Sequence, residues 1–228
     1  MKNGRCLGLV GGLGVGATIH YYRKLVKAHE ERGRIPDMVI AHADTPRVFD
    51  YVQAGDREGL AEYLNTFLRR LKAAGTEVAA IPAVTPHYCV RELVATSPLP
   101  LFNIFEPLVK ELAARGTRRI ALFGTRFVME SALFGFVEGV EFIQARPDEV
   151  DSIHSTYVEL AREGKGTEEQ HTKLSAIAHA LHARDGVETI VLAGTDLSVL
   201  FNEENTDFPY IDCAALHLDA IVQGLLDA

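Results

Sequence analysis

The sequence has only three cysteine residues, and they are scattered along the chain at Cys6, Cys89 and Cys213. Such isolated positions exclude a disulfide framework and also the paired spacing of a zinc-type ligand set. We therefore expect a reduced protein that holds no metal.

Long apolar runs are also missing, so no segment is expected to cross a bilayer. The residues before the first expected strand lack the apolar stretch and the small-residue cleavage site of a secretory signal. We expect a cytoplasmic protein with no membrane partner.

Basic residues are in the minority, with 23 lysines and arginines against 31 aspartates and glutamates. No basic stripe, arginine-rich tail or alternation of basic and aromatic residues is present, so nucleic acid is not an expected partner. The acidic surplus mainly favours solubility. A hydrophobic content of 47% over 228 residues is enough for the core of one large or two small domains.

The chain has no linker rich in proline, glycine or serine. Predicted strands and helices alternate throughout, which indicates α/β layers with parallel sheets. The expected strands are residues 6–10, 38–43, 78–83, 102–104, 119–123 and 189–193. The expected helices are residues 17–31, 57–75, 86–96, 170–183 and 211–226.

The pattern restarts in the second half of the chain. Residues 119–125 repeat the arrangement of residues 5–11, a strand that opens onto a glycine turn and a helix. Such repetition indicates a duplicated half-domain. We predict two pseudo-symmetric α/β lobes, formed by residues 1–102 with 208–228 and by residues 103–207. Because ligands bind beyond the carboxyl ends of parallel strands, we expect the ligand site in the interlobe cleft.

Titratable side chains follow the two corresponding strands of these lobes. His87 follows the strand at 78–83, and Asp196 follows the strand at 189–193. His217 lies one turn inside the last helix, which Asp212 precedes. A histidine near an aspartate can act as an oriented acid or base. His87, Asp196 and His217 are therefore candidates for proton transfer.

A glycine-rich turn follows the first strand at residues 11–16. It contains neither a dinucleotide fingerprint nor a Gly-Lys-Ser/Thr motif, so a P-loop is excluded. Either its backbone amides approach an anion or it is a plain turn. Arg47, after the second strand, is either a carboxylate clamp with two parallel hydrogen bonds or a solvated surface arginine.

Cysteine and histidine residues on helices have two interpretations each. Cys89 is expected in the first turn of a helix, where the dipole favours a thiolate, and Cys213 precedes another helix. Either is a displaced nucleophile or base, or else a buried structural thiol. His171, His179 and His182 are interpreted as a solvated helix face, because the zinc-type partners are missing.

Several motifs, taken in order, resemble those of the aspartate/glutamate (Asp/Glu/hydantoin) racemase family and cover most of the chain. They are Gly11-Gly12-Leu13-Gly14 with Ala17-Thr18 and Tyr21-Tyr22, residues 78–87, Gly124-Thr125 with Glu130-Ser131, Glu163-Gly164-Lys165, residues 189–196, and Asp212 with His217. The resemblance implies an amino-acid racemase that needs neither pyridoxal phosphate nor another cofactor. It also implies a small amino acid or dicarboxylate as ligand, and a homodimer.

The chain departs from the family at the two residues that matter most for the reaction. In the family, two cysteines face each other across the bound amino acid and move its α-proton. Ala83 and Gly194 stand at those positions and carry no transferable proton. The resemblance therefore implies a divergent member without the two-thiol mechanism. The ligand-binding groups that the resemblance carries over are Arg47, Lys165, Thr85, Thr125 and Thr195.

Three functions remain open on the sequence alone. The protein is an isomerase that acts on aspartate, glutamate or a similar acid through His87, Asp196 or His217. It is a decarboxylase or lyase that acts at the same carbon through these residues. Or it is a catalytically silent protein that binds a ligand or a partner.

Overall fold

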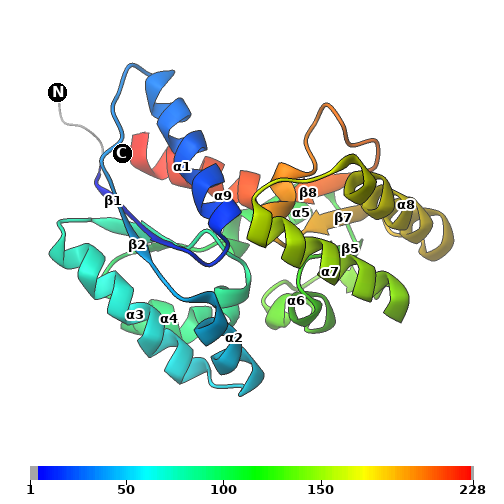
Figure 1. The fold of residues 1–228 in the computed structure, drawn as a ribbon, viewed down its shortest axis with the longest axis horizontal. Helices are drawn as coiled ribbons and strands as arrows, with labels where there is room; N and C mark the ends of the chain where they lie inside the picture. The colour runs from blue at the N-terminus through cyan, green and yellow to red at the C-terminus, as the bar shows by residue number, and fades with distance from the viewer. Residues whose placement is uncertain (1–4, 227–228) are drawn as a thin grey trace. The chain divides into compact units, whose positions relative to one another are not determined.

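A computed structural model describes residues 5–226 and divides into two units, whose elements are labelled in Figure 1. The first unit runs to Asn103 and resumes at His217, and the second comprises Ile104–Leu216. Each unit contains its own four-stranded sheet, in which every described strand pair is parallel. The predicted α/β class with two parallel sheets is confirmed.

The sheet of the first unit has the strand order β2-β1-β3-β4. Its strands are β1 (Leu7–Gly11), β2 (Met38–His42), β3 (Val78–Ala80) and β4 (Leu101–Phe102). Leu7 lies opposite both Met38 and Val78, so these three parallel strands begin at the same level. Their carboxyl ends therefore point to one common edge of the sheet. All of β1 and β3 is buried, as expected for central strands covered on both faces.

Helices flank this sheet on both sides. They are α1 (Val15–Glu30), α2 (Thr45–Gln53), α3 (Arg57–Ala73), α4 (Val90–Thr96) and the latter part of α9 (Cys213–Leu226), with a 3₁₀ turn η1 (Thr85–Cys89). The connections from β1 to β2 and from β2 to β3 run in opposite directions across the sheet. Right-handed crossovers therefore place α1 on one face and α3 on the other, as Figure 1 shows.

The sheet of the second unit has the equivalent strand order, β6-β5-β7-β8. Its strands are β5 (Arg119–Phe123), β6 (Glu141–Phe142), β7 (Thr189–Leu192) and β8 (Tyr210–Asp212). Its helices are α5 (Phe105–Arg115), α6 (Arg126–Glu130), α7 (Pro147–Glu163) and α8 (Glu168–Asp185), with 3₁₀ turns η2 (Leu133–Gly135) and η3 (Thr195–Val199). The shared strand order is what the repeated sequence pattern predicts.

Two of the predicted boundaries that differ from the structure lie near the end of the chain. The return to the first unit was expected at residue 208, but the units divide at His217. The reason is β8, a strand that is not among the predicted ones and that pairs with β7 in the second sheet. The last helix was expected from residue 211, but it begins at Cys213, because the Asp212 side chain accepts hydrogen bonds from the amides of Ala214 and Ala215.

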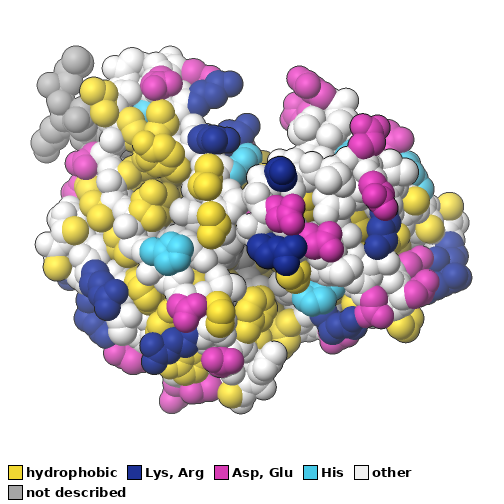
Figure 2. All heavy atoms as spheres, in the orientation of Figure 1, with side chains coloured by type: hydrophobic (Ala, Val, Ile, Leu, Met, Phe, Trp, Pro, Cys, Tyr) yellow, Lys and Arg dark blue, Asp and Glu magenta, His cyan; other side chains and the backbone are white. Residues whose placement is uncertain are grey.

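The surface carries both signs of charge. Figure 2 shows acidic and basic side chains on the surface of both units. Within residues 5–226, no helix has the length and apolar character needed to span a bilayer.

Candidate functional site

In the first unit, His87 lies just beyond the carboxyl end of β3. The chain leaves the strand through buried Ala83 and turns into η1, where Pro86 occupies the first turn. Nδ1 of His87 lies 2.8 Å from the carbonyl oxygen of Ala83. A carbonyl only accepts, so Nδ1 carries the proton and the neutral ring keeps its lone pair on Nε2. Burial lowers the pKa of His87 to about 4, so the ring is neutral at physiological pH.

His217, from α9, lies beside His87 with the two ring centroids 6.2 Å apart. Its Nε2 donates to the Phe102 carbonyl at 2.9 Å, and its Nδ1 accepts from the Tyr21 hydroxyl at 3.1 Å. Burial, followed by the proximity of His87, lowers the pKa of His217 to about 3. Both nitrogens of His217 are engaged inside the first unit, an arrangement that positions the ring.

The glycine turn of the first unit is held by its own side chains. The Gly12 amide donates to Thr18 Oγ1 at 3.0 Å, and its carbonyl accepts from Thr45 Oγ1 at 2.7 Å. Gly12 has φ +84°, and a Cβ there would lie 2.6 Å from the carbonyl oxygen of Ala43. The Gly12 amide is thus used within the turn, so the plain-turn interpretation fits this residue.

Arg47 lies on α2, after the carboxyl end of β2, and is exposed. Its guanidinium carbon lies 5.1 Å from the centroid of the Tyr63 ring. The Tyr63 hydroxyl accepts a hydrogen bond of 2.9 Å from the Asp44 amide, which fixes that ring. No carboxylate within residues 5–226 pairs with Arg47. The Arg47 guanidinium is thus stabilised by the Tyr63 ring and is available to an anionic ligand.

Thr85, in η1, is half-buried at the same edge of the first sheet. In the second unit, Thr125 is the N-cap of α6 and accepts from the Val128 amide at 3.2 Å. Lys165 is exposed in the loop after α7 and has no ion pair within the described part of the chain. Thr125 thus has a local structural role, and Lys165 is an available cation of the second unit.

At the carboxyl end of β7, the residues Gly194, Thr195 and Asp196 are all buried. All three contact Tyr157, a residue of α7 that is not among the predicted site residues. The Tyr157 hydroxyl donates to Asp196 Oδ2 at 3.3 Å and also hydrogen-bonds the Thr195 side chain. A Cβ added to Gly194 would lie 2.7 Å from Cδ2 and 3.0 Å from Cζ of Tyr157. The tyrosine ring therefore occupies the space that a side chain at position 194 would fill.

The three cysteines are buried thiols. Burial raises the pKa of Cys89 to about 12, with Glu92 adding to the effect, and raises the pKa of Cys6 to about 11. Burial also raises the pKa of Cys213 far above its ordinary value. These pKa directions favour the interpretation of Cys89 and Cys213 as buried structural thiols, because desolvation outweighs any help from a helix terminus.

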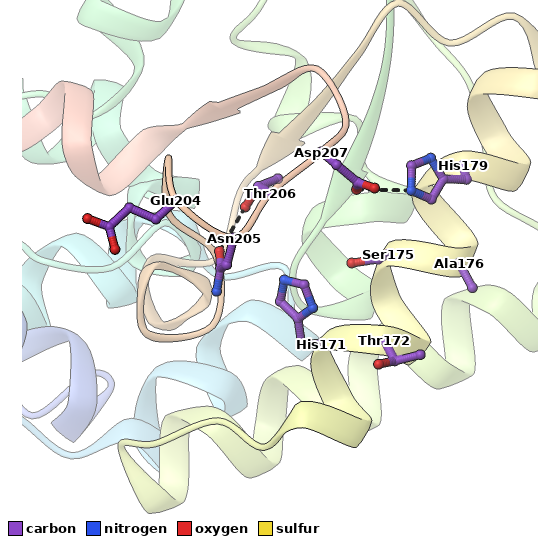
Figure 3. A pocket seen from close by; sticks show the side chains of 9 residues that line it. All are labelled: His171, Thr172, Ser175, Ala176, His179, Glu204, Asn205, Thr206 and Asp207. Carbon is purple, nitrogen blue, oxygen red and sulfur yellow. Dashed lines mark hydrogen bonds and ion pairs between the residues drawn. The ribbon is translucent and has the colours of Figure 1, made fainter.

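A surface pocket of the second unit lies elsewhere, between α8 and the loop at residues 204–207 (Figure 3). Nε2 of His179 pairs there with Asp207 Oδ1 at 3.0 Å. His179 and His182 are exposed, whereas His171 is half-buried against the Phe201 ring. Within residues 5–226, no group of His, Cys, Asp and Glu side chains is arranged to hold a metal ion. None of the predicted site residues lines this pocket.

Two equivalent parallel sheets, each ending in polar side chains at its carboxyl edge, define the chain as a duplicated α/β protein. The family model described as Asp/Glu/Hydantoin racemase matches residues 10–221. The chain therefore belongs to the Asp/Glu/hydantoin racemase family.

Individual relatives agree with this assignment. The chain is 24% identical over 224 residues to the broad specificity amino-acid racemase RacX of Bacillus subtilis, covering 92% of this chain and 93% of RacX. A Yersinia pestis crystal structure provisionally described as an Asp/Glu racemase is 25% identical, with a TM-score of 0.79 over 96% of this chain and 98% of that one.

An aspartate racemase homologue from Pyrococcus horikoshii has the same fold. It is 21% identical, and its TM-score is 0.74 over 96% of this chain and 98% of that one. Together these matches identify a racemase-like protein and leave its substrate open.

Proposed function

We propose that the protein is a cofactor-independent isomerase that moves a proton at the α-carbon of a small amino acid or dicarboxylate, such as aspartate or glutamate. The observation that carries the proposal is the state of His87. Its Nδ1–H is tied to Ala83 at the end of β3, so its basic nitrogen is Nε2. A neutral imidazole held in one tautomer is a suitable general base for carbon-acid chemistry.

Thiol chemistry is not required by this proposal. Ala83 and Gly194 have no titratable side chain, and the buried cysteines are held as neutral thiols. His87 supplies the base in the first unit, and Asp196 is the corresponding titratable group after β7 in the second unit.

Ligand binding in this proposal depends on cations. Arg47 is supported by the Tyr63 ring and has no carboxylate partner within residues 5–226, and Lys165 is exposed and equally unpaired there. These two side chains bind the carboxylates of the ligand, and the Thr85 hydroxyl contributes a further contact. An arginine can engage a carboxylate through two parallel hydrogen bonds.

A second candidate is a catalytically silent protein that binds the same class of ligand. It is favoured by the low basicity of the buried histidines, with the pKa of His87 at about 4 and that of His217 at about 3. A base of this strength removes an α-proton slowly unless the ligand changes its surroundings.

Proton exchange in D₂O distinguishes the two candidates. The protein, freed of small molecules by dialysis, is incubated with single amino acids and dicarboxylates, and the α-proton signal is followed by NMR. The isomerase proposal predicts that this signal disappears for at least one acid. Binding of an acid with a full α-proton signal would contradict it and support the silent protein.

Replacement of His87 then tests the assigned base. His87→Asn keeps an N–H for the Ala83 carbonyl but removes the basic nitrogen, so exchange should slow by about 100- to 10,000-fold. His182→Asn, on the exposed side of α8, is the matched control and should exchange as the wild type does. Equal rates for all three proteins would remove His87 from the mechanism.

A further inference from the structure

Tyr157 makes contact with three consecutive residues at the carboxyl end of β7. Its ring packs on Gly194, and its hydroxyl interacts with the side chains of Thr195 and Asp196. The tyrosine reaches this position from the middle of α7, where it is nearly fully buried. A tyrosine that filled space alone would need one hydrogen-bond partner for its hydroxyl, whereas this hydroxyl lies between two side chains of the strand end.

Glycine at position 194 is what allows the approach. A Cβ at this position would lie 2.7 Å from Cδ2 of Tyr157, a separation closer than van der Waals contact allows. The lack of a side chain at Gly194 and the position of the tyrosine are therefore one structural feature. The Tyr157 phenol is thereby placed at the carboxyl end of β7, where Gly194 itself has no functional group.

The direction of the hydrogen bond between Tyr157 and Asp196 shows which residue keeps its proton and which carries the charge. The Tyr157 hydroxyl donates to Asp196 Oδ2, which stabilises the charged form of this fully buried carboxylate. Burial, followed by the charge of Asp196, raises the pKa of Tyr157 well above its ordinary value. The phenol thus remains a proton-bearing donor wherever the carboxylate is ionised.

We propose that Tyr157 is a positioning residue that orients Asp196 and sets its charge for proton transfer in the second unit. The inference rests on the proposed function, in which Asp196 handles a proton at the α-carbon. Tyr157 acts through the carboxylate: the proton moves between Asp196 and the ligand, while the phenol keeps its own.

The test uses Tyr157→Phe, which keeps the ring against Gly194 and deletes only the hydroxyl. With this one donor removed, Asp196 should ionise at higher pH, so the acidic limb of the exchange rate against pH should move up by about one pH unit. Tyr210→Phe, on β8 of the same unit, is the matched control and should leave the profile in place. Asp196→Asn should lower the exchange rate and leave only the acidic limb that comes from protonation of His87. A limb that stays in place in Tyr157→Phe, or a normal rate in Asp196→Asn, would overturn the inference.

A second readout needs no turnover. Carboxyl ¹³C NMR follows the titration of Asp196 directly in the wild type and in Tyr157→Phe, and Asp196→Asn identifies the signal. The inference predicts a higher titration midpoint in Tyr157→Phe, and an unchanged midpoint overturns it. If the midpoint is raised but the protein exchanges no α-proton, the interaction between Tyr157 and Asp196 is supported and the proposed function is contradicted.

Discussion

The Tyr21 hydroxyl donates a hydrogen bond of 3.1 Å to Nδ1 of His217, and the two residues come from α1 and α9. Both side chains are fully buried. Because the other ring nitrogen of His217 donates to the Phe102 carbonyl, the Tyr21 bond satisfies the last polar atom of the ring. Helix α9 is thereby tied to α1 and to the end of β4.

Tyr21→Phe should therefore destabilise the first unit. It leaves Nδ1 of His217 buried without a donor, which costs about 1–3 kcal/mol. Urea unfolding measures the loss, and Tyr22→Phe is the control, since Tyr22 is 48% exposed. Equal stability of the two variants would contradict the assigned hydrogen bond.

Stability should fall as the pH falls through the weakly acidic range. The unfolded histidines have a pKa near 6.5, whereas burial lowers the folded values to about 4 for His87 and about 3 for His217. Between these limits the unfolded chain binds protons that the folded chain does not. Each histidine then lowers the free energy of unfolding by up to about 1.4 kcal/mol for each pH unit. Its contribution stops falling once the pH is below its pKa in the folded protein.

Unfolding free energies measured at a series of pH values test this slope. His87→Asn should reduce the slope, because it removes one of the histidines whose pKa burial lowers. A slope in His87→Asn equal to that of the wild type would show that His87 is protonated as easily when folded as when unfolded.

The buried thiols should resist modification in the native protein. Because burial raises the pKa of Cys89 and Cys213, iodoacetamide at mildly alkaline pH should label neither residue until the chain unfolds. Mass spectrometry of native and urea-unfolded samples gives the result. Rapid native labelling of Cys89 would restore it as a candidate nucleophile.

Arg47→Met should weaken the binding of a dicarboxylate by about 10- to 100-fold, since a charge-assisted hydrogen bond contributes about 1.5–3 kcal/mol. Arg69→Met is the matched control, because Arg69 is also exposed in the first unit but pairs with Glu62. Calorimetric titration with aspartate or glutamate compares the two variants with the wild type. Equal affinities would exclude Arg47 from the ligand site.

Much of the fold was predictable from the sequence because burial determines it. Strands such as β7, with all four residues buried, appear in the sequence as continuous β-branched or apolar runs. Strand β8 was missed because only its central residue, Ile211, is buried, and it forms as a strand only by pairing with β7. Helix α7 is not among the predicted helices, although Pro147 at its start and Gly164 at its end, where φ is +66°, are typical of helix termini.

The candidate site was predictable only in part. Topology places His87 and Asp196 after corresponding strands, and the structure puts both there. Tyr157 was not predictable, because a tyrosine on the apolar side of a helix gives no sign of the strand end it will reach. The raised pKa of Cys89 was not predictable either, because it results from burial of the thiol in the folded protein. That both strand ends serve one ligand, and that the protein is a homodimer, stay predictions.

The central claim is that the protein moves an α-proton without a thiol. The most direct measurement is the rate of α-proton exchange in D₂O for a variant with Cys6, Cys89 and Cys213 all replaced by alanine, beside the wild type and His87→Asn, each checked for folding by circular dichroism. The account predicts a wild-type rate in the cysteine-free variant and a rate lower by about 100-fold or more in His87→Asn. Loss of exchange in the folded cysteine-free variant, with normal exchange in His87→Asn, would contradict it.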